Sequence, residues 1–378
     1  GGDRLADAGL ELMLHNRELS VGGGPRELLS KIPLRHRLER QLEKRLFGGE
    51  KIDGALLCDN GEINLRLASL LHFFDVPVVY FIPPKVWVWR ASRIEAIEQH
   101  VDLVLSILPF EEPIYRSWEI PFQYVGNPLV DEVDTKLSEE EAKLRLSISP
   151  ERRVLAVFVG SRHSEVRHHA RVFGQAVRKF LESLPAGERK PVVLLPAAQA
   201  IEPEALRASF AEALDGLDVD LKVVKGMSHE CLRAARAAVV KSGTSTLEAA
   251  LLGTPMVLAY ASSRSTAWIY RNVVRYRGFV GLVNLFLADK AERAMGFEEA
   301  LPAPVVAELI LERCTPELIS SELTRVWRDG AERDGMLAQL ARTRKLLAPS
   351  GPGDPSPLKR AAGAAWELFS KPPAVADV

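Results

Sequence analysis

The chain has 378 residues, a formal net charge of −1, and 47% hydrophobic against 26% charged residues. This is the composition of a soluble globular protein with room for two domains of ordinary size. The near-zero net charge excludes a general attraction to nucleic acid. The only cysteines, Cys58, Cys231 and Cys314, are far apart, which argues against a disulfide framework or a zinc site and fits a reducing cytoplasm. The longest apolar runs are far shorter than the ~20 residues that cross a bilayer.

Near the N-terminus, a helix that begins at Pro33 has leucines four residues apart and arginines and lysines over the rest of its surface. Such a helix usually packs its apolar side on a sheet and leaves the basic side in solvent. The alternative is that it lies on an anionic membrane surface.

Strand and helix patterns then alternate as far as residue 125. A buried strand over 55–58 ends in Asp59, Asn60, Gly61 and Glu62. Carboxylates just past a strand end lie where α/β sheets bind ligands, although the same residues also suit a simple turn. After a strand over 78–82, the loop 83–90 carries Trp87 and Trp89, which indicate either a lipid or sugar surface or a packed lid.

The alternation breaks at Gly126, Asn127 and Pro128, where we place a domain boundary, and restarts with a strand over 154–159. There Gly160, Ser161 and Arg162 precede a helix, so that a fixed cation joins a helix N-terminus, which suits phosphate. His163, His168 and His169 follow and are expected to be surface residues, because no carboxylate or cysteine completes a metal spacing.

The most informative stretch is a buried strand ending at Val240, followed by Ser242, Gly243 and Thr244 and then a helix. The free N–H groups of such a turn can bind an anion. Ser245 and Glu248 also form a capping-box pattern, which by itself explains both residues. Further on, we predict a loop at 282–285, helices over 304–313 and 316–328, a linker over 351–357, and a helix over 358–369 that crosses back to the first domain.

Two successive runs of strand–helix units predict two doubly wound α/β lobes with a cleft between them. Residues 1–127 form the first, incomplete lobe, residues 128–350 the second, and residues 351–378 the linker and final helix. No dinucleotide-binding, P-loop or nucleophile-elbow motif occurs.

Several short motifs, in order along nearly the whole chain, resemble those of the lipid-A-disaccharide synthase family. The residues 59–68 are similar to D-x-P-D-F-N-L-x-L-A, 84–90 to S-P-x-V-W-A-W-R, and 107–111 to I-L-P-F-E. The residues 160–165 resemble G-S-R-x-x-E, 242–248 resemble S-G-T-A-T-L-E, and 314–317 match a late family signature. Each motif is weak alone, but the ordered set is specific.

This resemblance implies a GT-B fold and a glycosyltransferase of lipid A biosynthesis. Such an enzyme moves 2,3-diacylglucosamine from its UDP derivative to 2,3-diacylglucosamine 1-phosphate (lipid X), inverts the sugar carbon, releases UDP, and requires no metal or other cofactor. Two lipid substrates imply a peripheral place on the cytoplasmic face of the inner membrane. Whether the chain forms a homodimer stays open.

The resemblance also implies roles for individual residues. Asp59 matches the family's essential aspartate and would be the catalytic base. The nucleotide would be held by Arg162, Ser242, Gly243, Thr244, Glu248 and Asn284, with Glu248 on the ribose hydroxyls. The acceptor and lipid side would be formed by Glu62, Asn64, Trp87, Trp89 and Arg90.

The chain departs from the family at definite places. A glycine-rich G-E-A-S-G-D loop near the family's N-terminus is absent, so we expect about one βαβ unit, roughly 30 residues or more, to be missing. Asn127, Val159 and Val283 replace a histidine and two prolines of the family's motifs. Two other interpretations therefore stay open: a remnant that binds UDP-sugar or lipid without transfer, and another GT-B enzyme such as a UDP-N-acetylglucosamine epimerase.

Overall fold

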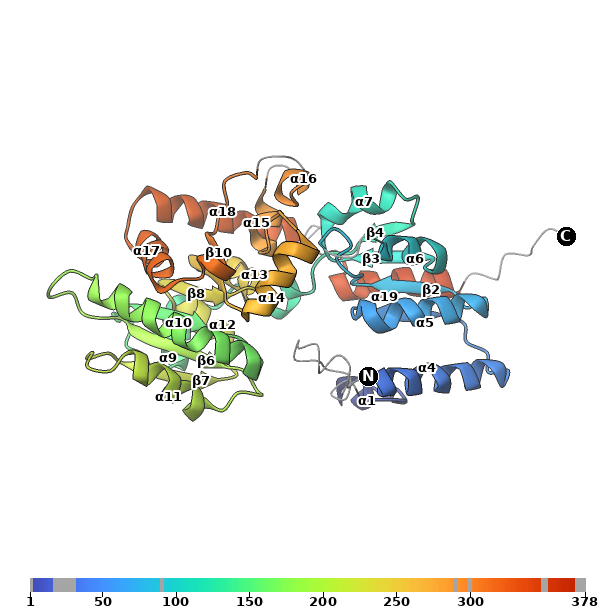
Figure 1. Ribbon diagram of the computed structural model, residues 1–378, viewed down its shortest axis with the longest axis horizontal. Helices are drawn as coiled ribbons and strands as arrows, with labels where there is room; N and C mark the ends of the chain where they lie inside the picture. The colour runs from blue at the N-terminus through green and yellow to red at the C-terminus, as the bar shows by residue number, and fades with distance from the viewer. Residues whose placement is uncertain are drawn as a thin grey trace. The chain divides into compact units, whose positions relative to one another are not determined.

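The computed structural model describes residues 3–15, 32–88, 92–288, 291–297, 301–347 and 353–370. The predicted acceptor-side residues Trp89 and Arg90 lie outside these ranges. The chain divides into two compact units, Gly1–Asn127 with Ser350–Val378, and Pro128–Pro349 (Figure 1). No helix in the described part of the chain is long and apolar enough to cross a membrane.

The first unit is built on a four-stranded parallel sheet in the order β1-β2-β3-β4. Its strands are short apolar runs. This is typical of parallel sheets, because helices cover both faces and the side chains on both sides of each strand are buried. The strands are β1 (Ala55–Cys58), β2 (Val78–Phe81), β3 (Leu103–Ser106) and β4 (Phe122–Tyr124). The helices are α1 (Asp3–Asp7), α4 (Ile32–Phe47), α5 (Gly61–Phe73), α6 (Arg93–His100), the 3₁₀ turn η1 (Pro109–Glu111), α7 (Glu112–Arg116) and α19 (Pro357–Phe369).

The side chains of β2 show how this sheet is covered on both faces. Val78 and Tyr80 belong to a core shared with α5 and α6, whereas Val79 and Phe81 belong to a core shared with α19. This alternation is the period of two that a strand imposes. The C-terminal helix α19 thus packs on the first unit's sheet although some 230 residues separate it from β4 in the chain, as the 2.9 Å bond from Arg360 Nε to Val125 O also shows.

The second unit is built on a six-stranded parallel sheet in the order β10-β9-β8-β5-β6-β7. Its strands are β5 (Val154–Phe158), β6 (Val192–Ala197), β7 (Leu221–Lys225), β8 (Ala237–Lys241), β9 (Met256–Tyr260) and β10 (Glu308–Ile310). From β5 the chain proceeds outward to β6 and β7, then returns to the other side of β5 through β8, β9 and β10. The strand order therefore reverses between β5 and β8, and ligands bind at such a switch point in open α/β sheets.

Helices cover both faces of this second sheet. The outward steps use α10 (His163–Glu182) and α11 (Pro203–Ala213), which pack together, and α17 (Pro316–Trp327) joins them against β8 and β9. Right-handed crossovers put the return helices α12 (Ser228–Ala234) and α13 (Ser245–Leu251) on the opposite face, where they contact each other. The remaining elements are α8 (Leu129–Glu132), α9 (Glu139–Arg145), α14 (Arg264–Ile269), the π-helical turn η2 (Tyr270–Val274), α15 (Leu282–Leu287), α16 (Ala291–Ala294), the 3₁₀ turn η3 (Leu311–Arg313) and α18 (Ala331–Leu347).

Two predicted elements are wrong. The predicted helix over 304–313 is the edge strand β10 followed by a 3₁₀ turn, because residues 308–310 pair in parallel with residues 258–260 of β9. The predicted loop at 282–285 is the helix α15, whose residues 283–287 are buried. At 304–313, the pairing of β10 with β9 overrides the helix start that Pro304 suggested, and at 282–287 the burial of the apolar side chains accompanies a helix where a loop was expected.

The predicted capping box is also wrong. Ser245 is the first residue of α13 and not its N-cap, and the N-cap Thr244 makes no side-chain cap bond. The hydroxyl of Thr246 instead donates to Gly243 O at 2.8 Å. The turn before α13 is therefore stabilised by a bond from inside the helix, and the N-cap contributes no capping side chain.

Candidate active site

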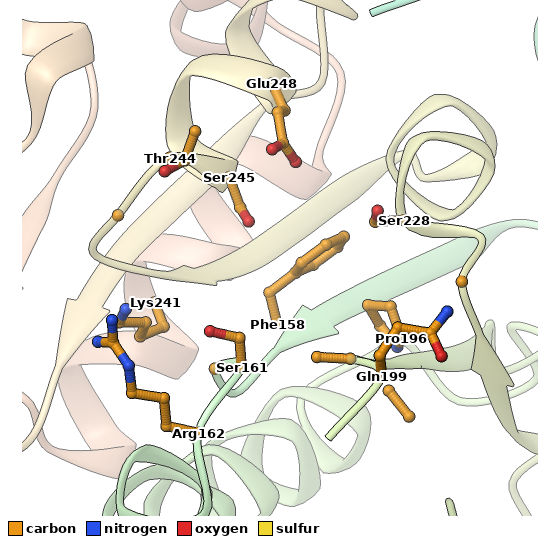
Figure 2. A pocket seen from close by; sticks show the side chains of 15 residues that line it. Phe158, Ser161, Arg162, Pro196, Gln199, Ser228, Lys241, Thr244, Ser245 and Glu248 are labelled. Atoms are coloured by element: carbon orange, nitrogen blue, oxygen red, sulfur yellow. The ribbon is translucent and has the colours of Figure 1, made fainter. Parts of the chain in front are cut away.

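A cavity of about 580 Å³ lies at the switch point of the second unit's sheet. Four loops that each follow the carboxyl end of a strand, β5, β6, β7 and β8, contribute to it (Figure 2). Parallel strands bring these loops to one edge although they lie far apart in sequence. The lining residues are Phe158, Gly160, Ser161, Arg162, Pro196, Ala197, Ala198, Gln199, Gly226, Ser228, Lys241, Gly243, Thr244, Ser245 and Glu248.

Two cations occupy one side of this cavity, Arg162 after β5 and Lys241 at the end of β8 (Figure 2). Both contact Glu165 in the first turn of α10: Lys241 Nζ lies 2.9 Å and Arg162 Nη1 3.3 Å from Glu165 Oε1. The other carboxylate oxygen, Oε2, accepts from Ser161 N at 2.9 Å. Burial alone would raise the pKa of Glu165, but the Lys241 ammonium, the Ser161 N–H and Arg162 together hold that pKa below its usual range. The cluster thus carries two positive charges and one negative charge.

Gly160 allows this arrangement. Its φ is +125°, and a Cβ there would lie 2.6 Å from both Cβ and Oε2 of Glu165. Any other residue at this position would collide with the carboxylate that holds Lys241. The glycine is therefore needed both for the turn and for the close approach of Glu165.

Glu248 projects from α13 into the other side of the cavity, with Ser228 facing it (Figure 2). Burial raises the pKa of Glu248, the nearby His229 lowers it, and Glu132 raises it. His229 Nε2 lies 4.0 Å from Glu248 Oε2. A half-buried carboxylate of this kind can accept hydrogen bonds from a pair of neighbouring hydroxyls on a ligand.

The other predicted nucleotide residues differ in position. Gly243 and Thr244 line the cavity, whereas Ser242 does not; its N–H donates to Ala259 O at 3.2 Å and extends the pairing of β8 with β9. The structure does not bring Asn284 to the cavity. Asn284 is 1% exposed, its Nδ2 donates to Val306 O and Glu308 Oε1 at 2.8 Å each, and its Oδ1 accepts from Val306 N at 2.9 Å. Its polar atoms therefore anchor β10 to α15.

Sequence reasoning missed several lining residues, above all Lys241, Gln199 and Ser228. Each stands at or within a few residues of the carboxyl end of a parallel strand, as Asp59 and Arg162 do. Applying that one rule to every strand would have found them.

Asp59 lies at the equivalent edge of the first unit, directly after β1. Its backbone is left-handed, with φ at 51°, and Asn60 follows with φ at 39°. Asp and Asn tolerate this conformation better than most residues. Two side chains hold the Asp59 carbonyl in place: Asn64 Nδ2 and Tyr80 OH each donate to it at 2.7 Å. The Asp59 residue itself is exposed, so its carboxylate is presented to solvent from a fixed backbone.

The predicted Asn64 is thus a positioning residue, since its Nδ2 also donates to Cys58 O at 2.9 Å. Glu62 forms an ion pair and hydrogen bond with Arg93 of α6. At the neighbouring Gly61, an added Cβ would lie only 2.8 Å from Pro84 Cβ. The loop after β2 is therefore pressed against the start of α5, beside Asp59.

Trp87 fixes that loop from the other end. Its side chain is buried, its Nε1 donates to Glu111 Oε1 at 2.9 Å, and its ring packs edge-on against Phe110 at 5.6 Å. Ser106 Oγ donates to the other oxygen of Glu111 at 2.5 Å. Burial raises the pKa of Glu111 to about 7, against the effect of these two donors. Of the two interpretations of Trp87, the structure therefore favours the packed loop over an exposed lipid surface.

The architecture and the cavity define a GT-B protein. A UDP-GlcNAc 2-epimerase from Neisseria meningitidis bound to UDP-GlcNAc superposes with a TM-score of 0.52 at 12% identity, covering 90% of this chain and 85% of that one. The Staphylococcus aureus MnaA–UDP structure gives a TM-score of 0.54 at 12% identity, with 89% and 81% covered. At such identities the likeness concerns the fold alone.

Sequence comparison identifies the family. The family model described as Lipid-A-disaccharide synthetase matches residues 1–336. A lipid-A-disaccharide synthase of Myxococcus xanthus is 36% identical over 351 residues, 93% of this chain and 85% of that protein. One of Syntrophotalea carbinolica is 32% identical, covering 93% and 83%. The chain belongs to the lipid-A-disaccharide synthase family, glycosyltransferases of lipid A biosynthesis.

Proposed function

We propose that this protein transfers 2,3-diacylglucosamine from its UDP derivative to lipid X, forming the β-1,6-linked disaccharide phosphate and releasing UDP. The observation that carries the proposal is the cationic cavity at the switch point between β5 and β8. On one side it has Lys241 and Arg162, both held by Glu165, and on the other the half-buried carboxylate of Glu248. A nucleoside diphosphate needs this combination: cations for the diphosphate and an acceptor for the ribose hydroxyls.

In this reaction the acceptor's 6-hydroxyl attacks the anomeric carbon of the donor, whose bond to the UDP oxygen breaks. Asp59 takes the hydroxyl proton as the general base. Its exposed carboxylate on a backbone fixed by Asn64 and Tyr80 supports this role. Attack from the face opposite UDP inverts the configuration.

The departing UDP gains negative charge as the bond breaks. Arg162 and Lys241 offset that charge, helped by the N–H groups of residues 243–245, so that these groups stabilise the transition state more than the ground state. Glu248 orients the nucleotide through the ribose. These residues supply the electrostatic role without a metal ion. Because donor and acceptor both carry acyl chains, we place the protein at the cytoplasmic face of the inner membrane.

The test is incubation of the protein with UDP-2,3-diacylglucosamine and lipid X in detergent micelles, with detection of both products. Disaccharide and UDP in equal amounts support the proposal. UDP binding without product supports the non-catalytic remnant, and conversion of UDP-N-acetylglucosamine to its 2-epimer supports the epimerase. A control with UDP-N-acetylglucosamine as donor separates a need for the acyl chains from general glycosyl transfer.

A further inference from the structure

One lysine of the first unit has no role in the site described above. Lys85 lies in the loop after β2 and is exposed. The motif that this loop resembles, S-P-x-V-W-A-W-R, leaves the position of Lys85 open, so the resemblance assigns it nothing. The question is which anion an exposed ammonium at this place can bind.

The backbone on both sides of Lys85 is held in place. On one side, Pro84 packs so closely on the start of α5 that a Cβ on Gly61 would lie 2.8 Å from it. On the other side, Trp87 donates to the buried Glu111 at 2.9 Å. Lys85 Nζ lies 5.9 Å from the centroid of the Trp87 ring, within the range of a cation–π contact. The ammonium is therefore carried by a fixed loop.

This loop brings Lys85 close to Asp59. The two residues follow the adjacent parallel strands β2 and β1, which belong to one layer of the first unit (Figure 1). Partial loss of solvent has the largest effect on the pKa of Lys85 and lowers it, whereas the carboxylates of Glu111 and Asp59 raise that pKa. Lys85 thus lies within electrostatic range of the proposed base.

Lys85 remains available to a ligand. The other cation beside the start of α5, Arg93, is paired with Glu62. No carboxylate in the described ranges forms an ion pair with Lys85. Residues 89–91 of the same loop lie outside those ranges, and their sequence adds Arg90 and no carboxylate. A ligand's anion therefore finds an accessible ammonium next to Asp59.

We propose that Lys85 binds the 1-phosphate of the acceptor and makes the protein select a phosphorylated acceptor over one without phosphate. This inference rests on the proposed function. The 6-hydroxyl and the 1-phosphate of the acceptor project from the two carbons that flank the ring oxygen. A group that binds the phosphate while Asp59 takes the hydroxyl proton must therefore lie beside Asp59, about one sugar ring away. Lysine binds phosphate as a point charge, and a fixed ammonium orients the hydroxyl toward the base.

The test compares two acceptors in detergent micelles, lipid X and 2,3-diacylglucosamine without the phosphate, with UDP-2,3-diacylglucosamine as donor. Lys85→Met is expected to raise KM for lipid X about tenfold with little change in kcat, because one charge-assisted contact is lost. The KM for the acceptor without phosphate is expected to stay unchanged. Lys85→Arg keeps the charge and is expected to behave as the parent does.

The matched control is Lys51→Met, at another exposed lysine of the first unit, which is expected to leave both KM values unchanged. Circular dichroism verifies that each variant is folded. Equal KM values for lipid X in the parent and Lys85→Met overturn the proposal. A lower kcat with both acceptors, together with an acid limb moved to higher pH, also overturns it, because Lys85 would then act on the ionisation of Asp59.

Titration calorimetry with lipid X in the absence of donor separates this inference from the proposed function. A parent that binds lipid X but forms no disaccharide contradicts the proposed function, while weaker binding by Lys85→Met still supports the phosphate contact. A parent that forms disaccharide but binds lipid X no better than Lys85→Met does keeps the proposed function and overturns the inference. Absence of any lipid X binding by the folded parent overturns both.

Discussion

Lys241, which lines the cavity of the second unit, has its Nζ 2.9 Å from Glu165 Oε1. The two residues are 76 positions apart: Lys241 ends β8, and Glu165 lies in the first turn of α10, which follows the adjacent strand β5 at the point where the strand order reverses. Glu165 fixes the lysine, and the Ser161 N–H fixes Glu165. The cation is therefore in place before a ligand arrives, which reduces the reorganisation needed on binding.

Replacing Lys241 by glutamine is expected to weaken UDP binding about tenfold to a hundredfold, because one charge-assisted contact to the diphosphate is lost. Lys241→Arg is expected to retain most of the affinity. Uridine, which has no phosphate, is expected to bind the parent and Lys241→Gln equally. Titration calorimetry measures all three, with the surface variant Lys179→Gln as control. Equal UDP affinities for Lys241→Gln and the parent would exclude the lysine from the diphosphate site.

Replacing Glu248 by alanine is expected to weaken UDP binding by about tenfold or more, through loss of the bonds to the ribose hydroxyls. A ligand without those hydroxyls, 2′,3′-dideoxy-UDP, is expected to bind Glu248→Ala and the parent alike. The pKa of Glu248 is raised by burial. Protonation therefore begins to weaken UDP binding at a higher pH than it would for an exposed glutamate, and the variant lacks this acid limb. An undiminished effect of the mutation on the dideoxy ligand would contradict the ribose role.

Replacing Asp59 by asparagine is expected to lower kcat by at least about 10²-fold while KM changes little, because the general base is removed and the binding groups remain. Asparagine tolerates the left-handed backbone of this position, so the fold is preserved. Asp75→Asn is the matched control, since Asp75 is also exposed and left-handed, with φ at 54°. Steady-state kinetics with both substrates measures these effects. If Asp59→Asn is as active as Asp75→Asn, Asp59 is not the general base.

His169 makes folding stability depend on pH. The expected surface position of His169 is wrong, because it is fully buried on α10. Its Nδ1 donates to Val159 O at 2.8 Å, and burial lowers its pKa to about 4 from a model-peptide value of 6.5. Between these pH values the unfolded chain binds a proton that the folded chain excludes, so stability is lost as pH falls through this window. The loss amounts to at most about 3 kcal/mol.

Denaturant unfolding at a series of pH values between about 7 and 4 measures this loss. This range roughly spans the pKa of an unperturbed histidine and the lowered pKa of His169. His169→Gln is expected to show a shallower acid slope, because glutamine can donate to Val159 O but does not titrate. His168→Gln, at the exposed neighbouring position, is expected to keep the parental slope. Identical slopes for the parent and His169→Gln would assign the acid sensitivity to other groups.

The sequence by itself determined the class of fold and pointed to several residues of the candidate sites. Apolar runs separated by helical patterns specify parallel strands with crossovers, and the right-handed rule leaves few arrangements. Asp59, Arg162, Gly243 and Thr244 stood out because each follows a strand within a few residues. The local pattern assigned Glu248 only to a helix cap, and its expected role on the ribose came from the family resemblance. These relationships are local, and a period of two or 3.6 residues reveals them.

Only the tertiary structure decided which side chains from distant segments contact one another. The Lys241–Glu165 pair and the anchoring of Asn284 on Glu308 join segments that no local pattern connects. The same holds for Trp87, whose bond to Glu111 buries a ring that the sequence left as either lid or lipid contact. β10 formed a strand against its local signal because β9 offered a free edge. Side-chain partners depend on distances between distant segments, and a linear pattern carries no information on those distances.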